Sequence, residues 1–126
     1  MKLVVNLTLG AAIGILGESL ALARALGLGD REVMDVLSES PIGGMVLAKR
    51  ANVESEDYEP RFKLELAAKD LGLGLEAAER AGLDLPEVAA AEEWMKRSIA
   101  AGAGGRDISA VVATILDQGA TDGRGG

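Results

Sequence analysis

The sequence predicts an all-α fold, and three observations lead to that prediction. Its 126 residues suit one hydrophobic core and are too few for two. Hydrophobic residues make up 48% of the chain but aromatic residues only 2%, so the core must be aliphatic. Ala, Leu, Glu and Lys favour helices, whereas the β-branched and aromatic runs typical of strands are scarce. We therefore expect one helical domain over 1–118, followed by a disordered tail over 119–126.

The first element is expected to be a long helix from about Lys2 to Leu26, ended by the glycines that follow it. Small residues along one side should allow another helix to approach closely, namely Gly10, Ala11, Gly14 and Gly17. The glycines disfavour helix by about 1 kcal/mol each, so tertiary packing must compensate for them.

The uncharged run 3–17 also resembles a secretory signal with a cleavage site near Ala21–Ala23, which would make this a secreted protein. Against that alternative, Asn6, Thr8 and three glycines interrupt the run, and Glu18 precedes the supposed cleavage site. The run is also shorter than the roughly 20 residues that span a membrane. We therefore expect a buried helix, no membrane association and a cytoplasmic protein.

Five further helices are expected. Asp30 should cap a short helix reaching about Ser38, and after Pro41 another short helix should cover about 45–51. The polar stretch 53–60 is predicted to be a surface loop, followed by a major helix over about 62–81. Asp84 should cap a helix over about 86–100 and Asp107 the last one. The predicted inward residues are Val33, Val36 and Leu37 in the second helix, and Ile108, Val111, Val112 and Ile115 in the last.

The composition excludes several classes of function. The net charge of −7 argues against nucleic acid as a partner, because nucleic-acid binding needs clustered Lys and Arg. The chain has no cysteine and no histidine, so it offers no disulfide, thiolate nucleophile or imidazole base. No spacing of carboxylates indicates a metal site, and we expect no metal.

Two polar pairs are candidates for a functional site. Lys2 and Asn6 are four residues apart, so on a helix they share a face and can meet the same small molecule. Lys69 and Asp70 are adjacent and do not face each other on a helix, so they are not a self-contained salt bridge. The alternative is that the first pair is a helix-start lysine with a tolerated polar residue and the second is solvated surface.

The string from Gly72 to Ala77 fits the G-x-G-x-x-A pattern of dinucleotide-binding sites. That motif binds a pyrophosphate only where a strand turns into a helix. No strand is predicted before Gly72, and the charged pair at 69–70 stands directly upstream. We interpret these glycines as a helix-crossing contact.

The order of features along the chain is more specific than any single motif. The features are K-L-V-V-N at 2–6, Glu18 and Ala21, Gly27-Leu28, Phe62 seven residues before Lys69-Asp70-Leu71, Leu85-Pro86, and G-x-G-G-x-D-I-S-A at 102–110. From about Lys2 to Leu116 the chain resembles the C-terminal domain of the 3-hydroxyisobutyrate dehydrogenase and 6-phosphogluconate dehydrogenase superfamily, the β-hydroxyacid dehydrogenases. The resemblance implies a 6-phosphogluconate dehydrogenase C-terminal-domain-like helical bundle with one long N-terminal helix.

The resemblance also implies roles for individual residues. Lys2 is similar to the catalytic lysine, and Asn6 and Asp70 to substrate-site residues. Lys69 and Phe62 are similar to residues near the cofactor. Asp107 matches a D-x-S pattern and is expected to be structural. The family often has asparagine where this chain has Val5, so its substrate contacts are expected to differ.

The activity that the resemblance implies is hydride transfer between a nicotinamide cofactor and a 3-hydroxyacid or its aldehyde or keto form. The ammonium of Lys2 suits that chemistry, because it can stabilise negative charge on the substrate oxygen and donate a proton. NAD or NADP would be bound mainly by an N-terminal Rossmann domain, which we expect to be absent from this chain, so the chain alone should be inactive. A homodimer is expected as well. The alternative is a stand-alone helical dimerisation module without catalysis.

Overall fold

The computed structural model describes the backbone of residues 1–125 and the side chains of residues 1–118. Within residues 1–125 there are six helices: α1 (Lys2–Ala25), α2 (Asp30–Leu37), α3 (Gly43–Ser55), α4 (Leu64–Arg80), α5 (Pro86–Ala100) and α6 (Ala110–Gly125). Within 1–125 the only β contact is an isolated antiparallel bridge between Lys63 and Asp107. The predicted all-α fold is therefore confirmed.

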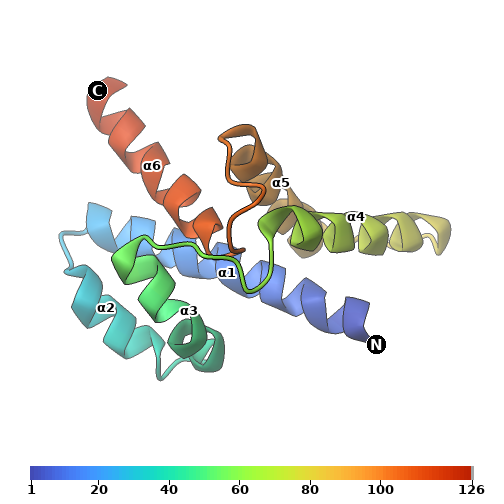
Figure 1. Ribbon diagram of the computed structural model, residues 1–126, viewed down its shortest axis with the longest axis horizontal. Helices are drawn as coiled ribbons and strands as arrows, with labels where there is room; N and C mark the ends of the chain where they lie inside the picture. Colours follow the sequence, from blue (N-terminus) through green and yellow to red (C-terminus); the bar gives the residue numbers. More distant parts are fainter. Residues whose placement is uncertain (126) are drawn as a thin grey trace.

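The long helix α1 crosses the molecule and is contacted by all five other helices (Figure 1). Its residues Ile13, Leu16 and Leu20 are buried in the aliphatic core. By length and composition α1 could also cross a membrane, and a third of its most apolar window is buried. The core helix of a soluble protein passes the same test.

Two glycines of α1 confirm the prediction of close helix contacts. A Cβ at Gly10 would lie 3.1–3.3 Å from side-chain atoms of Met95 in α5 and Leu71 in α4. A Cβ at Gly17 would lie 2.5 Å from Cδ1 of Ile115 in α6. The packing of three helices against α1 therefore compensates for the low helix propensity of these glycines.

The end of α1 is formed as the sequence predicts. Gly27 has a φ of +80°, a conformation that L side chains rarely adopt. The Leu28 N–H then donates to the Ala23 carbonyl at 2.9 Å, which satisfies one of the carbonyls that a helix end leaves open.

The predicted aspartate caps are wrong for α2 and α5. The residue before α2 is Gly29, while Asp30 is the first helical residue and its carboxylate pairs with Arg24. Leu85 precedes α5, and no side chain caps that helix. An aspartate caps a helix only when its carboxylate reaches an amide of the first turn, and the sequence does not reveal that geometry.

The predicted inward face of α2 is also partly wrong. Met34 is fully buried and Val36 is exposed, while Val33 and Leu37 are partly buried against the core. An eight-residue helix is rotated into place by its contacts with α1 and α3, so its own periodicity decides little.

The other helices differ from the predictions mainly at their ends. Helix α3 is longer than expected and replaces the start of the predicted 53–60 loop, while α4 begins two residues later than expected, at Leu64. The residues predicted to face inward in the last helix are all buried, but Ile108 precedes α6 and only Val111, Val112 and Ile115 lie in it. The backbone of α6 extends past the expected end near Gly119, and the predicted disorder of 119–126, whose side chains lie outside the described residues, stays a prediction.

The 72–77 string lies inside α4, with no strand before it. A Cβ at Gly74 would lie 3.0 Å from Leu7 of α1, and one at Gly72 would lie 3.3 Å from Glu92 of α5. These glycines therefore serve helix crossing, as predicted, and the string lacks the strand-to-helix turn that a pyrophosphate requires.

Candidate active-site groove

The structure brings the five predicted site residues together in one groove of ≈ 540 Å³. The groove lies between the start of α1, the loop before α4 and the first half of α4. Its lining residues are Lys2, Asn6, Arg61, Phe62, Leu66, Lys69, Asp70 and Leu73. Residues more than 50 positions apart in sequence thus meet because α4 packs along α1.

Asn6 and Asp70 form the polar floor of the groove. The Asn6 amide Nδ2 donates to Asp70 Oδ2 at 2.8 Å, and both residues are partly buried. This bond joins α1 to α4 and fixes the orientation of both side chains. The remaining carboxylate oxygen of Asp70 and the amide oxygen of Asn6 are left to accept hydrogen bonds from a ligand.

Three cations surround this floor, namely Lys2, Arg61 and Lys69. All three residues are exposed, and none forms a side-chain hydrogen bond or ion pair within the described part of the chain. The chain as a whole carries a net charge of −7, so unpaired cations gathered in one place are unusual for it. A groove with this charge attracts a small anionic molecule.

Phe62, the chain's single phenylalanine, supplies the aromatic surface of the groove and is partly buried. The exposed side chains of Leu66 and Leu73 extend this apolar wall along α4. Apolar walls with a few convergent polar groups are typical of small-molecule sites.

The loop that carries Arg61 and Phe62 is held by a carboxylate from the far end of the chain. Asp107 is fully buried, and its Oδ1 accepts hydrogen bonds from the backbone N–H groups of Arg61 at 3.0 Å and Phe62 at 3.2 Å. Its Oδ2 accepts the N–H of Ser109 at 3.0 Å and the Ser109 hydroxyl at 2.5 Å. The buried Lys49 ammonium donates to both oxygens, at 3.1 and 3.0 Å. Asp107 is structural in this geometry, as expected.

These bonds lower the pKa of Asp107 to about 2. Burial alone would raise this pKa, but the hydrogen bonds from the Ser109 hydroxyl and amide, from Lys49 and from the Phe62 amide outweigh it. The Asp107 carboxylate is therefore ionised at neutral pH and remains a strong acceptor.

Backbone pairing reinforces the same loop. The Ile108 N–H donates to the Phe62 carbonyl at 2.9 Å, and the Asp107 N–H donates to the Tyr58 carbonyl at 2.8 Å. The first amides of α4, at Leu64 and Glu65, donate to carbonyls in the 104–106 loop at 2.8 and 2.9 Å. This pairing explains why α4 begins at Leu64, because the residues just before it are bound through their backbone to the 103–108 segment.

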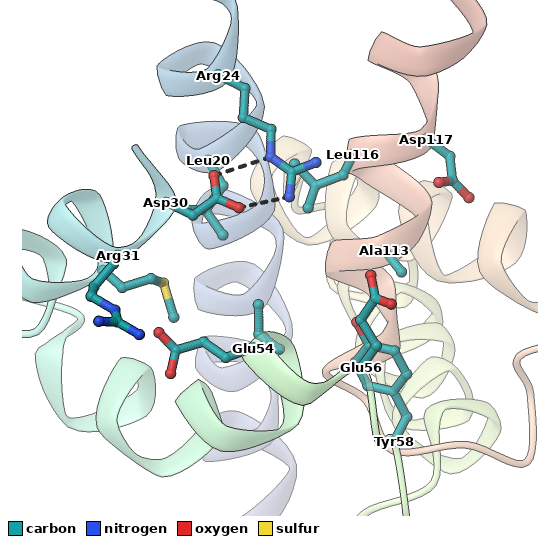
Figure 2. Close-up of a pocket in the computed structure, with 12 residues that line it drawn as sticks. Leu20, Arg24, Asp30, Arg31, Glu54, Glu56, Tyr58, Ala113, Leu116 and Asp117 are labelled. Atoms are coloured by element: carbon teal, nitrogen blue, oxygen red, sulfur yellow. Dashed lines mark hydrogen bonds and ion pairs between the residues drawn. The ribbon is translucent and has the colours of Figure 1, made fainter. Parts of the chain in front are cut away.

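A second hollow, of ≈ 360 Å³, lies at the other end of α1 and contains none of the predicted site residues (Figure 2). The Arg24 guanidinium and the Asp30 carboxylate on its rim pair with each other at 2.7 Å, and Glu54 is held by Arg50. The pKa of Tyr58 in this hollow is raised by burial and then by the negative charge of Glu56 and Asp117. The cations that line the first groove lack such internal partners.

The sequence did not single out Arg61, which lines the groove, or Lys49, which pairs with the buried Asp107. Arg61 stands beside Phe62 but belongs to no recognisable motif, and a chain with many surface charges gives no reason to single it out. Lys49 lies 58 residues from Asp107, so no local spacing connects them. The apolar run 45–48 directly before Lys49 was the one local signal, but Arg50 and Asn52 follow it, so Lys49 does not stand out as a buried lysine.

The structure thus defines an all-helical domain with a groove at the start of its long first helix, where Lys2 and Asn6 of α1 lie opposite Lys69 and Asp70 of α4. The chain matches, over residues 1–115, the family described as "NAD-binding of NADP-dependent 3-hydroxyisobutyrate dehydrogenase". It therefore belongs to that family, within the β-hydroxyacid dehydrogenase superfamily.

Curated relatives agree with this assignment. The chain is 31% identical to glyoxylate/succinic semialdehyde reductase 1 of Arabidopsis thaliana, over 91% of this chain and 40% of the relative. It is 34% identical to 2-(hydroxymethyl)glutarate dehydrogenase of Eubacterium barkeri, over 89% of this chain and 38% of the relative. The chain thus spans about 40% of the length of these relatives.

A solved structure shows the same fold. The crystal structure of 3-hydroxyisobutyrate dehydrogenase from Salmonella typhimurium superposes with a TM-score of 0.80 at 30% identity, covering 89% of this chain and 40% of that one. The expected likeness to the helical C-terminal domain of this superfamily is confirmed.

The family name implies a nicotinamide cofactor. The groove suits the nicotinamide end of that cofactor but not its phosphates or its adenosine. The described residues contain no strand-to-helix turn for the phosphates, since the glycine pattern at 72–77 lies within α4. Phe62 and Lys69 line the groove and could contact a nicotinamide ring placed over it. The phosphates and the adenosine would need protein surface beyond this groove.

Proposed function

We propose that this chain is the substrate-site half of an NAD(P)-dependent oxidoreductase acting on a 3-hydroxyacid or its aldehyde or keto form. The observation that carries the proposal is that Lys2, Asn6, Phe62, Lys69 and Asp70 line one groove. The names of two curated relatives and of one solved structure, which are dehydrogenases or a reductase of small acids or their aldehydes, support the same chemistry. The nucleotide-binding half is proposed to lie in another stretch of polypeptide.

A bound nicotinamide supplies or accepts the hydride in this chemistry. Lys2 is proposed to stand at the substrate oxygen, where its ammonium stabilises the negative charge that develops during reduction and donates a proton. Asn6, fixed by Asp70, orients the substrate beside Lys2. Lys69 attracts the carboxylate of the substrate, and Phe62 excludes water from one side of the groove.

Replacement of Lys2 tests the proposal. In the complete enzyme, Lys2→Met should lower kcat by about 10²- to 10⁴-fold, the usual contribution of a general acid or base. Because Lys2 is exposed at the start of α1, the thermal midpoint should hardly change. Steady-state kinetics of hydroxyacid oxidation and a thermal melt measure both effects.

Lys63→Met is the matched control, because Lys63 is also exposed and precedes α4 but does not line the groove. It should retain the activity of the unchanged enzyme. Equal activity of the Lys2→Met and unchanged enzymes would remove Lys2 from the mechanism.

The mass of the native polypeptide separates this proposal from a stand-alone dimerisation module. Peptides of this domain should be recovered from source cells in a protein near 30 kDa, since a nucleotide-binding domain adds roughly 150 residues. A native mass equal to the 12.9 kDa of this chain would favour the module.

We also propose a cytoplasmic protein that is not processed near residue 23. Cleavage there would remove Ile13, Leu16 and Leu20, three fully or almost fully buried residues of the core. N-terminal sequencing of the mature protein should find residues of α1 upstream of Ala21. A mature protein that begins at about residue 24 would contradict this proposal.

A further inference from the structure

Arg61 is the one cation of the groove that the proposed mechanism does not use. It precedes Phe62 and lines the same surface as Lys2 and Lys69. Its guanidinium forms no hydrogen bond or ion pair with any described residue. Its backbone, in contrast, is fixed.

The fixed backbone distinguishes Arg61 from an ordinary surface arginine. Its N–H donates to the buried Asp107 carboxylate at 3.0 Å, and the next amide, of Phe62, donates to the same oxygen at 3.2 Å. The Phe62 carbonyl in turn accepts the Ile108 N–H. The backbone of Arg61 is therefore fixed relative to the groove. Less conformational entropy is lost when its guanidinium binds a ligand.

The charges of the groove indicate what that ligand carries. Lys2 is assigned to the reacting oxygen and Lys69 to a carboxylate. The only carboxylate lining the groove is Asp70, which is engaged by Asn6 through one oxygen. A substrate with a single carboxylate leaves the Arg61 guanidinium without a counter-charge.

We propose that Arg61 is a specificity-determining residue that binds a second carboxylate of the substrate, so that the substrate class is a hydroxy- or oxo-dicarboxylic acid. The inference rests on the proposed function for the place of the reacting oxygen. Arginine suits this task because its planar guanidinium donates two parallel hydrogen bonds to a carboxylate, which a lysine cannot do.

A binding experiment on this chain tests Arg61 independently of catalysis. Glutarate, a dicarboxylate, and butyrate, a monocarboxylate, are titrated separately into the 126-residue chain, and NMR follows the Arg61 side-chain Nε–H and the Phe62 amide. Glutarate should shift both signals at lower concentration than butyrate, and Arg61→Met should abolish the difference. Equal affinity for the two acids, or a glutarate preference that survives Arg61→Met, would overturn the proposal.

Kinetics of the complete enzyme test the same residue during turnover. Arg61→Met should raise KM for a hydroxydicarboxylate by about tenfold or more, the usual worth of a hydrogen-bonded charge pair, with kcat little changed. KM for a hydroxymonocarboxylate should change by less than about twofold. Arg61→Lys should restore only part of the affinity, because the two-point contact is lost.

Two results would overturn the proposal while the proposed function stands. One is an equal rise of KM for both classes of acid, and the other is a rise of KM for the cofactor alone. Arg80→Met, which removes an exposed arginine at the far end of α4, is the matched control and should leave both KM values unchanged. An enzyme that oxidises no hydroxyacid would contradict the proposed function, whereas the glutarate titration would still report on Arg61.

Discussion

At the scale of single residues, Asp107 contributes most to the order of the groove without lining it. Its two oxygens accept hydrogen bonds from Arg61, Phe62, Ser109 and Lys49. A buried carboxylate is costly unless each lone pair is satisfied, and here the partners come from three separate segments. The same bonds therefore stabilise the fold and position the loop at the candidate site.

The low pKa of Asp107 predicts acid sensitivity. The pKa falls from the ordinary 3.8 to about 2 in the folded protein, so the folded state favours the ionised form. The resulting stabilisation, about 2 kcal/mol, is complete above pH 4 and is lost as the pH falls toward 2. Urea unfolding followed between pH 2 and pH 6 measures it.

Ser109→Ala provides the comparison, because it removes one donor to Asp107 without unpairing Lys49. The variant should lose about 1–2 kcal/mol at neutral pH. The pKa of folded Asp107 should rise toward its ordinary value, so the acid-dependent loss should be smaller and should end at a higher pH. Curves for the two proteins that stay parallel from pH 6 to pH 2 would show that Asp107 does not cause the acid sensitivity.

The sequence predicted the site residues that are related by local spacing, but not those that long-range contacts bring into place. Lys2 and Asn6 share a helix face through their spacing, which is a local property and was predictable. Asp70 was noted as part of an adjacent charged pair, but only the resemblance placed it in the same site as Asn6, which lies 64 residues away. Arg61 and Lys49 had neither signal, because long-range pairing and the path of an irregular loop brought them into place.

At the scale of helices, the positions of the long helices were predictable and the short ones were less so. The residues of α1 and α6 have long apolar patterns, and both helices bury the expected faces. Helix α2 is too short for its periodicity to decide which side faces the core, and contacts with α1 and α3 turn Met34 inward instead of Val36. The predicted cap of α2 was wrong for a related reason, because the Asp30 carboxylate pairs with Arg24 and not with an amide of the first turn.

Two adjacent glycines at the start of α3 make a matched test of helix packing. A Cβ on Gly43 would collide with the Ser38 backbone carbonyl oxygen, whereas one on Gly44 would meet nothing within 4 Å. Gly43→Ala should lower the free energy of unfolding by about 1–3 kcal/mol, because a backbone atom must move. Gly44→Ala should raise it by about 0.5 kcal/mol, since alanine favours helix.

Urea denaturation of both variants measures the difference between them. Equal stability of Gly43→Ala and Gly44→Ala would mean that the turn between α2 and α3 adjusts at no cost. In that case the approach of Ser38 to Gly43 would not stabilise the fold.

At the scale of the whole molecule, α1 is both the centre of the core and an exposed apolar surface. Val4, Ile15, Leu22 and Leu26 are each about half exposed or more. Their spacings are close to whole numbers of turns at about 3.6 residues per turn, so the first three form one stripe along α1, which Leu26 continues just past the helix end. We propose that a second copy of the chain covers this stripe in a homodimer.

Leu22→Glu should break such a dimer, because it places a charge in the middle of the apolar stripe. Light scattering of the unchanged chain should give roughly twice the monomer mass of 12.9 kDa, and the variant should give the monomer. Leu47→Glu is the control, since Leu47 is equally exposed but lies on α3. An unchanged chain that remains monomeric at high concentration would contradict the proposal.

The tie between Asp107 and the loop at 61–62 also determines when the groove can be completed during synthesis. Lys2, Asn6, Lys69 and Asp70 stand on α1 and α4, which leave the ribosome before residues 103–108, and they can meet as soon as α4 docks on α1. Arg61 and Phe62 remain on an untied segment until residues 103–108 emerge, more than 40 positions later. We therefore expect the groove to acquire its aromatic wall and its third cation late in folding, when residues 103–108 join the core.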